Sequence, residues 1–291
     1  MANATQNSSK APAANRLATF NFGLGLLLVG GLGIAFIESD SQLALASMVD
    51  SFVDVIVAGA LVWALRIADQ PPDIDHPAGH QAAEPIAALI VAVLAGIMGV
   101  EVIHNAVDTV LSDQSPRLTD LVAGALATKL VLKFFVAAWC WQVMQRSGPA
   151  VRALFVDARN DILAGILAMA GYLMARYGWP GWDAWLAIPI GAWIIASGFG
   201  LARENMRLLM GEVASLERHE SLMRLVQAVP GVISGHELVA RHHGTHLDVV
   251  VHVVVDPDLP LRDAHDIGHQ AYIRLMNEPD VAAANVHLDV E

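Results

Sequence analysis

Four aspartates lie in stretches that are otherwise apolar. Asp50 and Asp54 fall in one such stretch, and Asp157 and Asp161 fall in another. Each pair is spaced i,i+4, which on a helix places both carboxylates on one face. A charged residue at the centre of a bilayer costs at least about 2.5–3.5 kcal/mol, so four of them require a compensating positive charge.

Two kinds of partner would compensate these carboxylates. A divalent cation is one such partner, and protons are the other. The same site would then hold metal in one state and protons in another. The alternative is pairing with bases in the apolar stretches, namely Arg159, Lys129 and Lys133. Metal and proton exchange at one site is the coupling that an antiporter requires.

A second group of potential ligands lies in a loop with several prolines, residues 71–84. Asp73, His76 and His80 would offer one ion the mixed nitrogen and oxygen ligation that suits Zn²⁺, Mn²⁺ or Fe²⁺, and Glu84 follows them. The prolines predict a turn rather than a helix. An ordinary polar surface loop is the alternative interpretation.

Histidine is concentrated near the C-terminus, where nine of the twelve histidines fall within the last 80 residues. His236, His252 and His287 lie on three predicted strands, and His265 lies on a predicted helix. His287 and Asp289 are two residues apart on one strand, so they point to the same face of a sheet. The other histidines of this region are interpreted as polar surface.

The elements that position these residues follow from the hydropathy pattern. The chain is 55% hydrophobic and 16% charged, which is typical of a membrane protein rather than a soluble enzyme. A bilayer core needs about 20 mostly apolar residues in helix. Six stretches qualify, at residues 17–37, 43–67, 85–107, 118–144, 150–177 and 182–206.

The predicted organisation has three parts. Residues 1–15 form a disordered N-terminal tail, 16–209 a membrane domain of six helices, and 210–291 a soluble domain. In the soluble domain, helical spacing at 214–229 and 261–277 and strand patterns at 232–241, 246–256 and 281–290 give the order αββαβ. This order predicts an open ferredoxin-like sandwich.

The predicted orientation follows from the basic residues. One side of the six-helix path holds seven of them: Lys10, Arg16, Arg66, Arg146, Arg152, Arg203 and Arg207. The other side holds Arg117 and Arg176. By the positive-inside rule both termini, and with them the histidine-rich domain, are cytoplasmic.

Composition also excludes several classes of protein. Acidic residues outnumber basic ones, 29 to 17, which argues against nucleic acid and favours cationic partners. The single cysteine, Cys140, excludes disulfide frameworks and cysteine metal clusters. No serine triad order, phosphate loop or HExxH motif is present, so an enzyme is not expected, and no prosthetic group is implied.

Taken in order along the chain, these motifs resemble those of the cation diffusion facilitator family. The resemblance implies a homodimer that exports Zn²⁺, Mn²⁺, Fe²⁺ or related ions such as Cd²⁺ from the cytoplasm in exchange for protons. It implies a transport site of Asp50, Asp54, Asp157 and Asp161, and a loop site of Asp73, His76 and His80. It further implies a two-metal cytoplasmic cluster of His236, His252, His265, His287 and Asp289.

Two features of the sequence depart from the family pattern. Zinc-preferring members usually have His at the place of Asp157, so an all-oxygen site here favours harder ions such as Mn²⁺. Some relatives have an inter-subunit salt bridge where this chain has Ala82 and Met210.

The absence of a transit signal favours a bacterial inner membrane over an organelle.

A second hypothesis from another class stays open. The chain would be a membrane-anchored metal sensor or assembly factor, with the cytoplasmic cluster as its working site and no transport. Metal flux by the whole protein distinguishes the two hypotheses.

Overall fold

The structure is a computed structural model that describes residues 11–39, 42–76, 79–112, 120–144, 148–177 and 182–290. Residues 1–10 of the predicted tail, Pro77 and Ala78 of the loop, and Lys10, Arg117 and Arg146 of the orientation argument lie outside these ranges.

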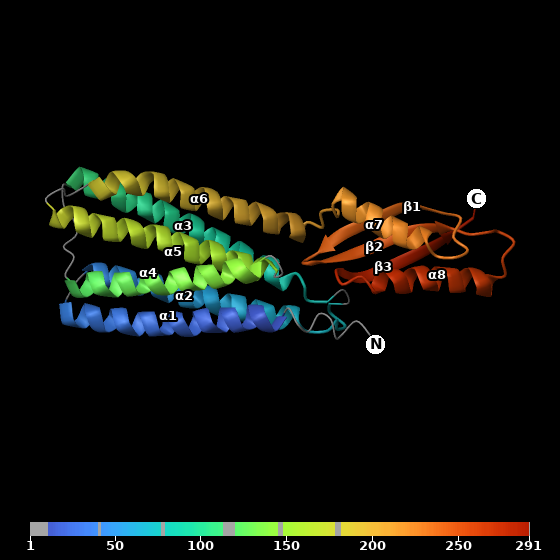
Figure 1. Cartoon of the computed structure of the whole chain (residues 1–291), viewed down its shortest axis with the longest axis horizontal. Coiled ribbons are helices and arrows are strands. Elements are labelled where there is room, and N and C mark those ends of the chain that lie inside the picture. Colours follow the sequence, from blue (N-terminus) through green and yellow to red (C-terminus); the bar gives the residue numbers. More distant parts are fainter. Residues whose placement is uncertain are drawn as a thin grey trace. The chain divides into compact units, whose positions relative to one another are not determined.

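Long helices make up the first compact unit of the chain, which spans Lys10–Arg66 and Ile86–Asn205 (Figure 1). They are α1 (Ala11–Ser39), α2 (Gln42–Ala68), α3 (Ala83–Ser112), α4 (Asp120–Met144), α5 (Pro149–Arg176) and α6 (Trp182–Leu209). Among the described residues, α1 to α4 contain the four stretches long and apolar enough to cross a membrane: Ala14–Ile37, Met48–Ala68, Ala83–Leu111 and Ala123–Met144. The α5 helix carries Asp157, Arg159 and Asp161 and is not among these four.

The N-terminal boundary is a correction to the sequence prediction. Helix α1 begins at Ala11, whereas residues up to 15 were expected to be disordered. Alanines at 11, 13 and 14 have the highest helix propensity, and Pro12 lies in the first turn, where no helical N–H is lost. The local helix preference therefore extends the first span toward the N-terminus.

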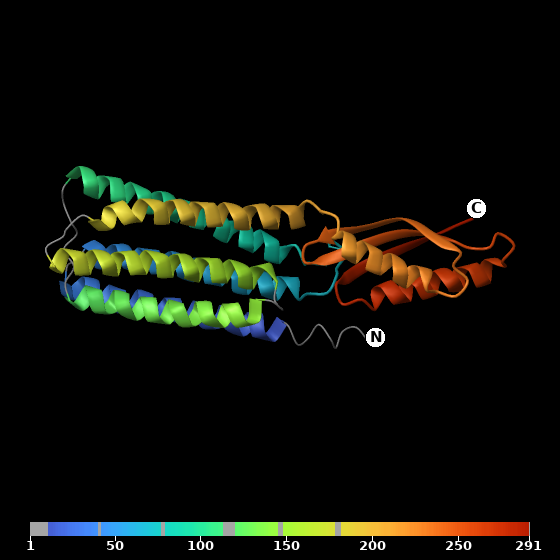
Figure 2. The same ribbon diagram turned by 45° about the horizontal axis from the view of Figure 1, so that its top comes forward.

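Helices α3 and α6 pack against each other through glycines. A Cβ on Gly99 would lie 2.6 Å from Ile195 Cγ1 and 2.8 Å from the Gly191 carbonyl oxygen, so only glycine allows this approach. Figures 1 and 2 show the two helices side by side in both views. Small residues at such crossings are typical of helices that pack in a bilayer. The i,i+4 pairs of aspartates and lysines lie on other helices, α2, α4 and α5.

The second compact unit contains Ile67–Pro85 and the C-terminal domain, Met206–Glu291. The domain consists of α7 (Leu216–Gln227), β1 (Ser234–His243), β2 (His246–Val254), α8 (Leu261–Met276) and β3 (Val281–Asp289). In the described residues the sheet order is β1-β2-β3, with β1 antiparallel and β3 parallel to β2. The element order αββαβ is the predicted one.

One face of this sheet forms the core of the domain. Val249, Val251 and Val253 alternate along β2 and are at most 1% exposed, and they pack with Leu222 of α7 and Leu275 of α8. Because successive side chains of a strand point to opposite faces, the residues between these valines lie on the face without helices. His252 is one of them.

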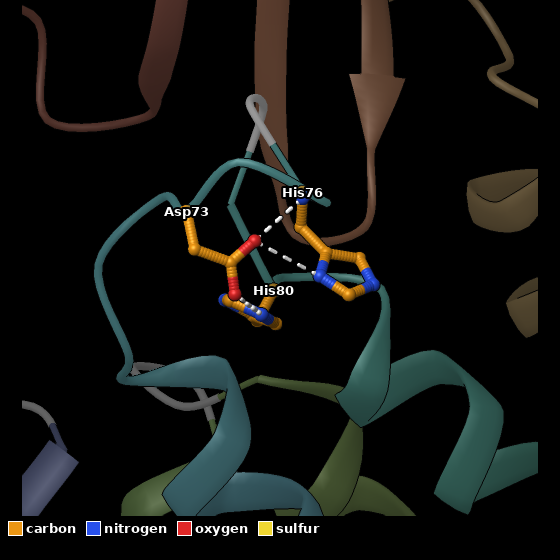
Figure 3. Close-up of side chains that lie close together, drawn as sticks. All are labelled: Asp73, His76 and His80. Carbon is orange, nitrogen blue, oxygen red and sulfur yellow. Dashed lines mark hydrogen bonds and ion pairs between the residues drawn. The ribbon is translucent and has the colours of Figure 1, made fainter.

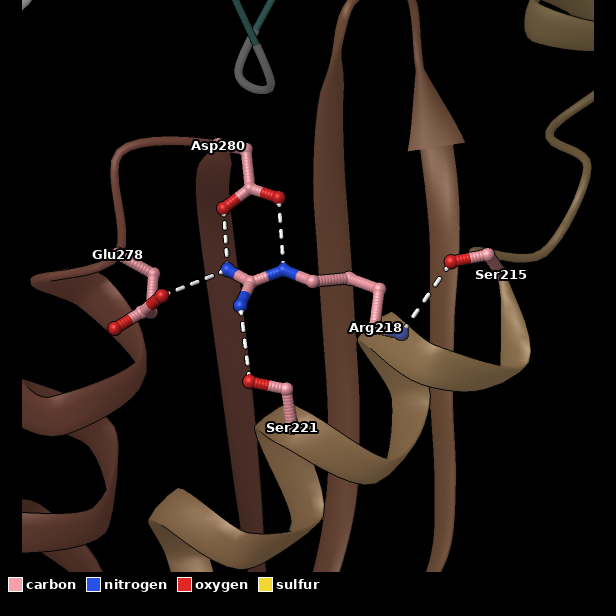
Figure 4. A network of polar contacts seen from close by, with 5 residues as sticks. All are labelled: Ser215, Arg218, Ser221, Glu278 and Asp280. Carbon is pink, nitrogen blue, oxygen red and sulfur yellow. Dashed lines mark hydrogen bonds and ion pairs between the residues drawn. The ribbon is translucent and has the colours of Figure 1, made fainter.

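Arg218 joins the start of α7 to the segment between α8 and β3 (Figure 4). Its guanidinium donates to Asp280 at 2.9 and 2.5 Å and to Glu278 at 2.8 Å, and its backbone N–H donates to Ser215 at 3.3 Å. Burial opposes the charge, but these carboxylates outweigh it and raise the pKa of Arg218. The Arg218 guanidinium therefore links the start of α7 to the segment that precedes β3.

We expect Arg218→Ala to lower the unfolding free energy of the domain by about 1–2 kcal/mol, because it removes charge-assisted bonds at a half-buried site. Arg224→Ala is the matched control. Arg224 lies on the same helix but pairs with Glu220 at 3.8 Å in solvent, so its loss should cost less than about 0.5 kcal/mol. Denaturant unfolding of residues 210–291, followed by circular dichroism, measures both. Equal losses of unfolding free energy in the two variants would show that the link made by Arg218 does not stabilise the domain.

Candidate metal centres

Three helices of the bundle each contribute a charged pair with i,i+4 spacing. The pairs are Asp50 and Asp54 on α2, Lys129 and Lys133 on α4, and Asp157 and Asp161 on α5. Helical periodicity places both members of each pair on one face. Asp54, Lys133 and Asp161 each lie near the middle of their helices, so the cluster lies deep within the bundle.

The lysines lie between the carboxylates. Lys133 Nζ is 3.0 Å from Asp54 Oδ2 and 3.6 Å from Asp157 Oδ2, and it also pairs with Asp161. Lys129 Nζ is 2.5 Å from Asp50 Oδ2 and 3.4 Å from Asp54 Oδ2. Carboxylates of α2 and α5 thus meet through the ammonium groups of α4.

The carboxylates approach one another closely enough to share an ion. Asp50, Asp54 and Asp161 each offer an oxygen, and these oxygens lie within 4.8 Å of one another. Asp157 is not part of this trio, although it is 7% exposed and contacts the same lysine. The structure therefore brings three of the four predicted residues into one group and places the fourth beside it.

The pairing with bases that the sequence left open is present for Lys129 and Lys133 but not for Arg159. The Arg159 guanidinium lies over the ring of Trp193 on α6, 5.7 Å from its centroid. Sequence reasoning named all three bases without ranking them. The i,i+4 spacing of the two lysines, which matches that of the aspartates, was the signal that distinguishes them.

The loop after α2 brings its three predicted ligands together (Figure 3). Asp73 Oδ1 is 3.2 Å from His76 Nδ1, and Asp73 Oδ2 is 3.3 Å from His80 Nε2. One ligand atom from each residue lies within 4.8 Å of the others. The His76 backbone N–H donates to Asp73 at 2.6 Å, and this bond, with the nearby imidazoles, lowers the pKa of Asp73. An ionised carboxylate and two imidazoles fit Zn²⁺, Mn²⁺ or Fe²⁺.

The loop is also attached to the hairpin between β1 and β2. The Thr245 hydroxyl donates to Gln81 Oε1 at 3.1 Å, and Gln81 Nε2 donates to the Ala68 carbonyl at 3.1 Å. Gly244 has φ +60°, and a Cβ there would overlap the Gln81 carbonyl. Glycine is needed at this position for both reasons.

The third group lies on the sheet face without helices. His236 pairs with His252 across β1 and β2, and His252 pairs with His287 across β2 and β3, so three imidazoles form one row. Asp289 Oδ2 is 3.6 Å from His236 Nε2 and 3.5 Å from His252 Nδ1. Ligand atoms of His236, His252 and Asp289 lie within 4.8 Å of one another, which fits a metal ion with nitrogen and oxygen ligands.

His265 is not brought into this group. It lies on α8, which packs on the opposite face of the sheet, and its ring stacks on that of His269 with centroids 6.2 Å apart. Glu237 is a residue that sequence reasoning missed. It has φ 48° at the β1 irregularity after His236, and its carboxylate is 3.9 Å from His252 Nε2. A β-bulge of this kind cannot be recognised from the alternation of apolar and polar residues in the sequence.

The Asp289 carboxylate is held in its ionised form. Hydrogen bonds from the His252 ring and from the Val290 N–H lower the pKa of Asp289. The stabilisation is complete above the ordinary pKa of an aspartate, and it is lost as the pH falls through the lowered value. This carboxylate therefore stays charged in mildly acidic solution.

We expect Asp289→Asn to weaken Zn²⁺ binding by residues 210–291 at least about tenfold, because a candidate metal ligand loses its charge. Isothermal titration of the domain measures the change. Asp258→Asn, in the exposed turn after β2, removes an equal charge away from the group and should leave the affinity unchanged. Equal affinities for both variants and the wild type would show that Asp289 is not a ligand.

Comparison with known proteins assigns both parts of the chain to a family. Residues 18–210 match the family model of the cation efflux transmembrane domain, and residues 214–291 match that of the cation efflux protein cytoplasmic domain. These matches define an integral membrane transporter for cations and not an enzyme. The chain belongs to the cation diffusion facilitator family.

Its relatives include efflux proteins of bacteria and a metal tolerance protein of a plant. It is 26% identical to the cation-efflux pump FieF of Cronobacter sakazakii over 84% of this chain and 82% of the relative. It is 25% identical to the manganese efflux system protein MneS of Bacillus subtilis, over 86% of each chain. It is 28% identical to metal tolerance protein 7 of rice over 92% of this chain and 69% of the relative. Divalent metal efflux is therefore the family activity.

Proposed function

We propose that this protein is a homodimeric antiporter of the bacterial inner membrane that exports a divalent transition metal from the cytoplasm in exchange for protons. Its six long helices span the membrane, with both termini and the C-terminal domain in the cytoplasm. Asp50, Asp54, Asp157 and Asp161 bind the cargo, and alternating access carries it across.

The observation that carries this proposal is the meeting of carboxylates from α2 and α5 near the middle of their helices. Charged groups within membrane helices mark ion pathways, because their burial is otherwise unfavourable. Three of the oxygens lie within 4.8 Å of one another, a separation that one cation can bridge. Carboxylates also take up protons in acid, which gives the site its second cargo.

The cargo we favour is Mn²⁺ or Fe²⁺, with Zn²⁺ and Cd²⁺ as competitors. A site built only from carboxylate oxygens suits harder ions, and it offers no imidazole or thiolate to select zinc. The manganese efflux protein MneS is among the relatives, which supports this preference.

The loop and sheet groups would act as cytoplasmic metal sites. The loop group lies just after α2, where it would receive cargo, and the sheet group would report metal through the domain arrangement of the dimer. His265 lies on the helical side of its own domain, so it would join a sheet group only across the dimer.

The test is metal flux in proteoliposomes. Purified full-length protein should carry Mn²⁺ or Fe²⁺ against an opposing proton gradient, followed by a metal-sensitive dye inside the vesicle and a pH dye alongside it. Metal flux that does not depend on the proton gradient would exclude proton coupling but would still support metal transport. No flux of any of the four metals, together with intact metal binding by the C-terminal domain, would favour the sensor hypothesis.

A further inference from the structure

The lysines of α4 occupy the place in the bundle where cargo would bind. Lys133 has a side chain that is 3% exposed and contacts carboxylates from both α2 and α5. Lys129 is 10% exposed and lies toward Asp50, whose own side chain is 36% exposed. The pair thus forms an inner and an outer cation within one cluster.

Neither the lysines nor the aspartates would be stable in this place alone. A buried charge that loses its partner is strongly destabilised, and the membrane interior increases that cost. Formal charges of the cluster leave two negative charges in excess, since four carboxylates face two ammonium groups. This excess equals the charge of one divalent cation.

A metal ion and Lys133 cannot use the same oxygens at once. Carboxylate oxygens lie about 2.0–2.2 Å from a bound Zn²⁺ or Mg²⁺, whereas Lys133 Nζ now lies 3.0 Å from Asp54 and also pairs with Asp161. An ammonium group left at that place would lie against the incoming cation and repel it. Lysine has a long flexible stem, so rotation of the side chain can withdraw the charge.

We propose that Lys133 is a tethered competitor of the cargo: it neutralises Asp54 and Asp161 in the metal-free bundle and must be displaced before a divalent ion coordinates them. Lys129 does the same for Asp50 at the outer edge of the cluster. This inference rests on the proposed transport site. It assigns to the lysines a role in setting metal affinity and release.

Displacement has a direct consequence for affinity. A tethered cation acts at a high effective concentration. The apparent affinity of the site for the metal is the intrinsic affinity multiplied by the fraction of sites that the lysine leaves open. A monovalent ion carries no more charge than the ammonium group, so it has no electrostatic advantage over Lys133 in binding the carboxylates. Lys133 therefore also excludes Na⁺ and K⁺, whereas a divalent ion can displace it.

The experiment compares metal binding by full-length variants in nanodiscs. All carry Asp73→Asn and Asp289→Asn, which disable the loop and sheet groups, and binding that Asp54→Asn abolishes is assigned to the bundle. We expect Lys133→Met to lower the Kd for Mn²⁺ at least about tenfold and to make binding sensitive to Na⁺. Lys129→Met should have a smaller effect, because Lys129 contacts the more exposed Asp50.

Arg152→Met is the matched control. Arg152 lies on α5 and pairs with Glu204 at 2.7 Å outside the cluster, so the same loss of a positive charge should leave the Kd unchanged. If Lys133→Met does not fold, Lys133→Met/Asp157→Asn restores the balance of charge and is compared with Asp157→Asn alone. That double variant should bind Mn²⁺ more tightly than the single one.

The outcomes separate the two proposals. If Asp54→Asn abolishes metal binding by the Asp73→Asn/Asp289→Asn protein and removal of Lys133 brings no gain in affinity, the tethered competitor is overturned and the transport site stays in place. Absence of any Asp54-dependent binding by the Asp73→Asn/Asp289→Asn protein would instead remove the proposed site itself, and the inference with it.

Discussion

Asp54→Asn should reduce metal efflux at least about a hundredfold, because a charged carboxylate at the centre of the proposed transport site is replaced by a neutral amide. Asp54 is 2% exposed and is the carboxylate that both lysines contact, at 3.4 and 3.0 Å. Its loss removes a carboxylate of the proposed site and leaves Lys133 with fewer partners. Proteoliposome flux of Mn²⁺ measures the effect, and Asp161→Asn should behave in the same way.

Loss of folding must be separated from loss of transport. Removing one partner of a buried pair costs about 3–5 kcal/mol, so the single variant is also expected to be less stable. The double variant Asp54→Asn/Lys129→Met removes one charge of each sign, and it should fold and still fail to transport. Asp108→Asn on α3 is the matched control, since this exposed carboxylate pairs with His104 at 3.5 Å away from the cluster. Normal flux in the double variant would show that Asp54 is not a ligand.

The parts of the fold that could be predicted from the sequence are those set by local periodicity. The i,i+4 spacing of the aspartates determines that each pair shares a helix face, and alternation along β2 determines that His252 opposes the core valines. The order αββαβ followed from the same patterns. Hydropathy alone does not locate the ends of helices, and the helix propensity of the alanines before the apolar stretch is the reason that α1 begins at Ala11.

The rest depended on contacts between elements that are distant in the chain. No local pattern indicates that the lysines of α4 reach carboxylates of both α2 and α5. Lys133 and Arg159 are therefore equal candidates from the sequence to pair with the aspartates, and only Lys133 does. The family resemblance grouped His265 with the sheet histidines, yet it lies on a helix that covers the other face of the sheet. The Gln81 contact with Thr245 joins residues 164 positions apart and has no signature in either segment.

Asp157→His should shift the cargo preference from Mn²⁺ toward Zn²⁺. Asp157 is 7% exposed and lies beside the carboxylate trio, 3.6 Å from Lys133 Nζ. An imidazole there would add a nitrogen ligand to an otherwise all-oxygen site, and Zn²⁺ gains more than Mn²⁺ from such a ligand. We expect the ratio of Zn²⁺ to Mn²⁺ flux to rise at least about tenfold, in the direction of the affinity order of these metals.

The control for this variant is Asp157→Asn, because the histidine also removes a negative charge. Asparagine removes the same charge and supplies no nitrogen ligand to the metal, so any change common to both variants comes from charge. Flux in mixtures of Mn²⁺, Fe²⁺, Zn²⁺ and Cd²⁺, with each metal quantified inside the vesicles, gives all the ratios in one assay. A rise confined to the histidine variant would mean that one residue on α5 determines whether the site prefers zinc. If both variants keep the wild-type ratio, Asp157 lies outside the coordination sphere, and the trio of Asp50, Asp54 and Asp161 alone sets the selectivity.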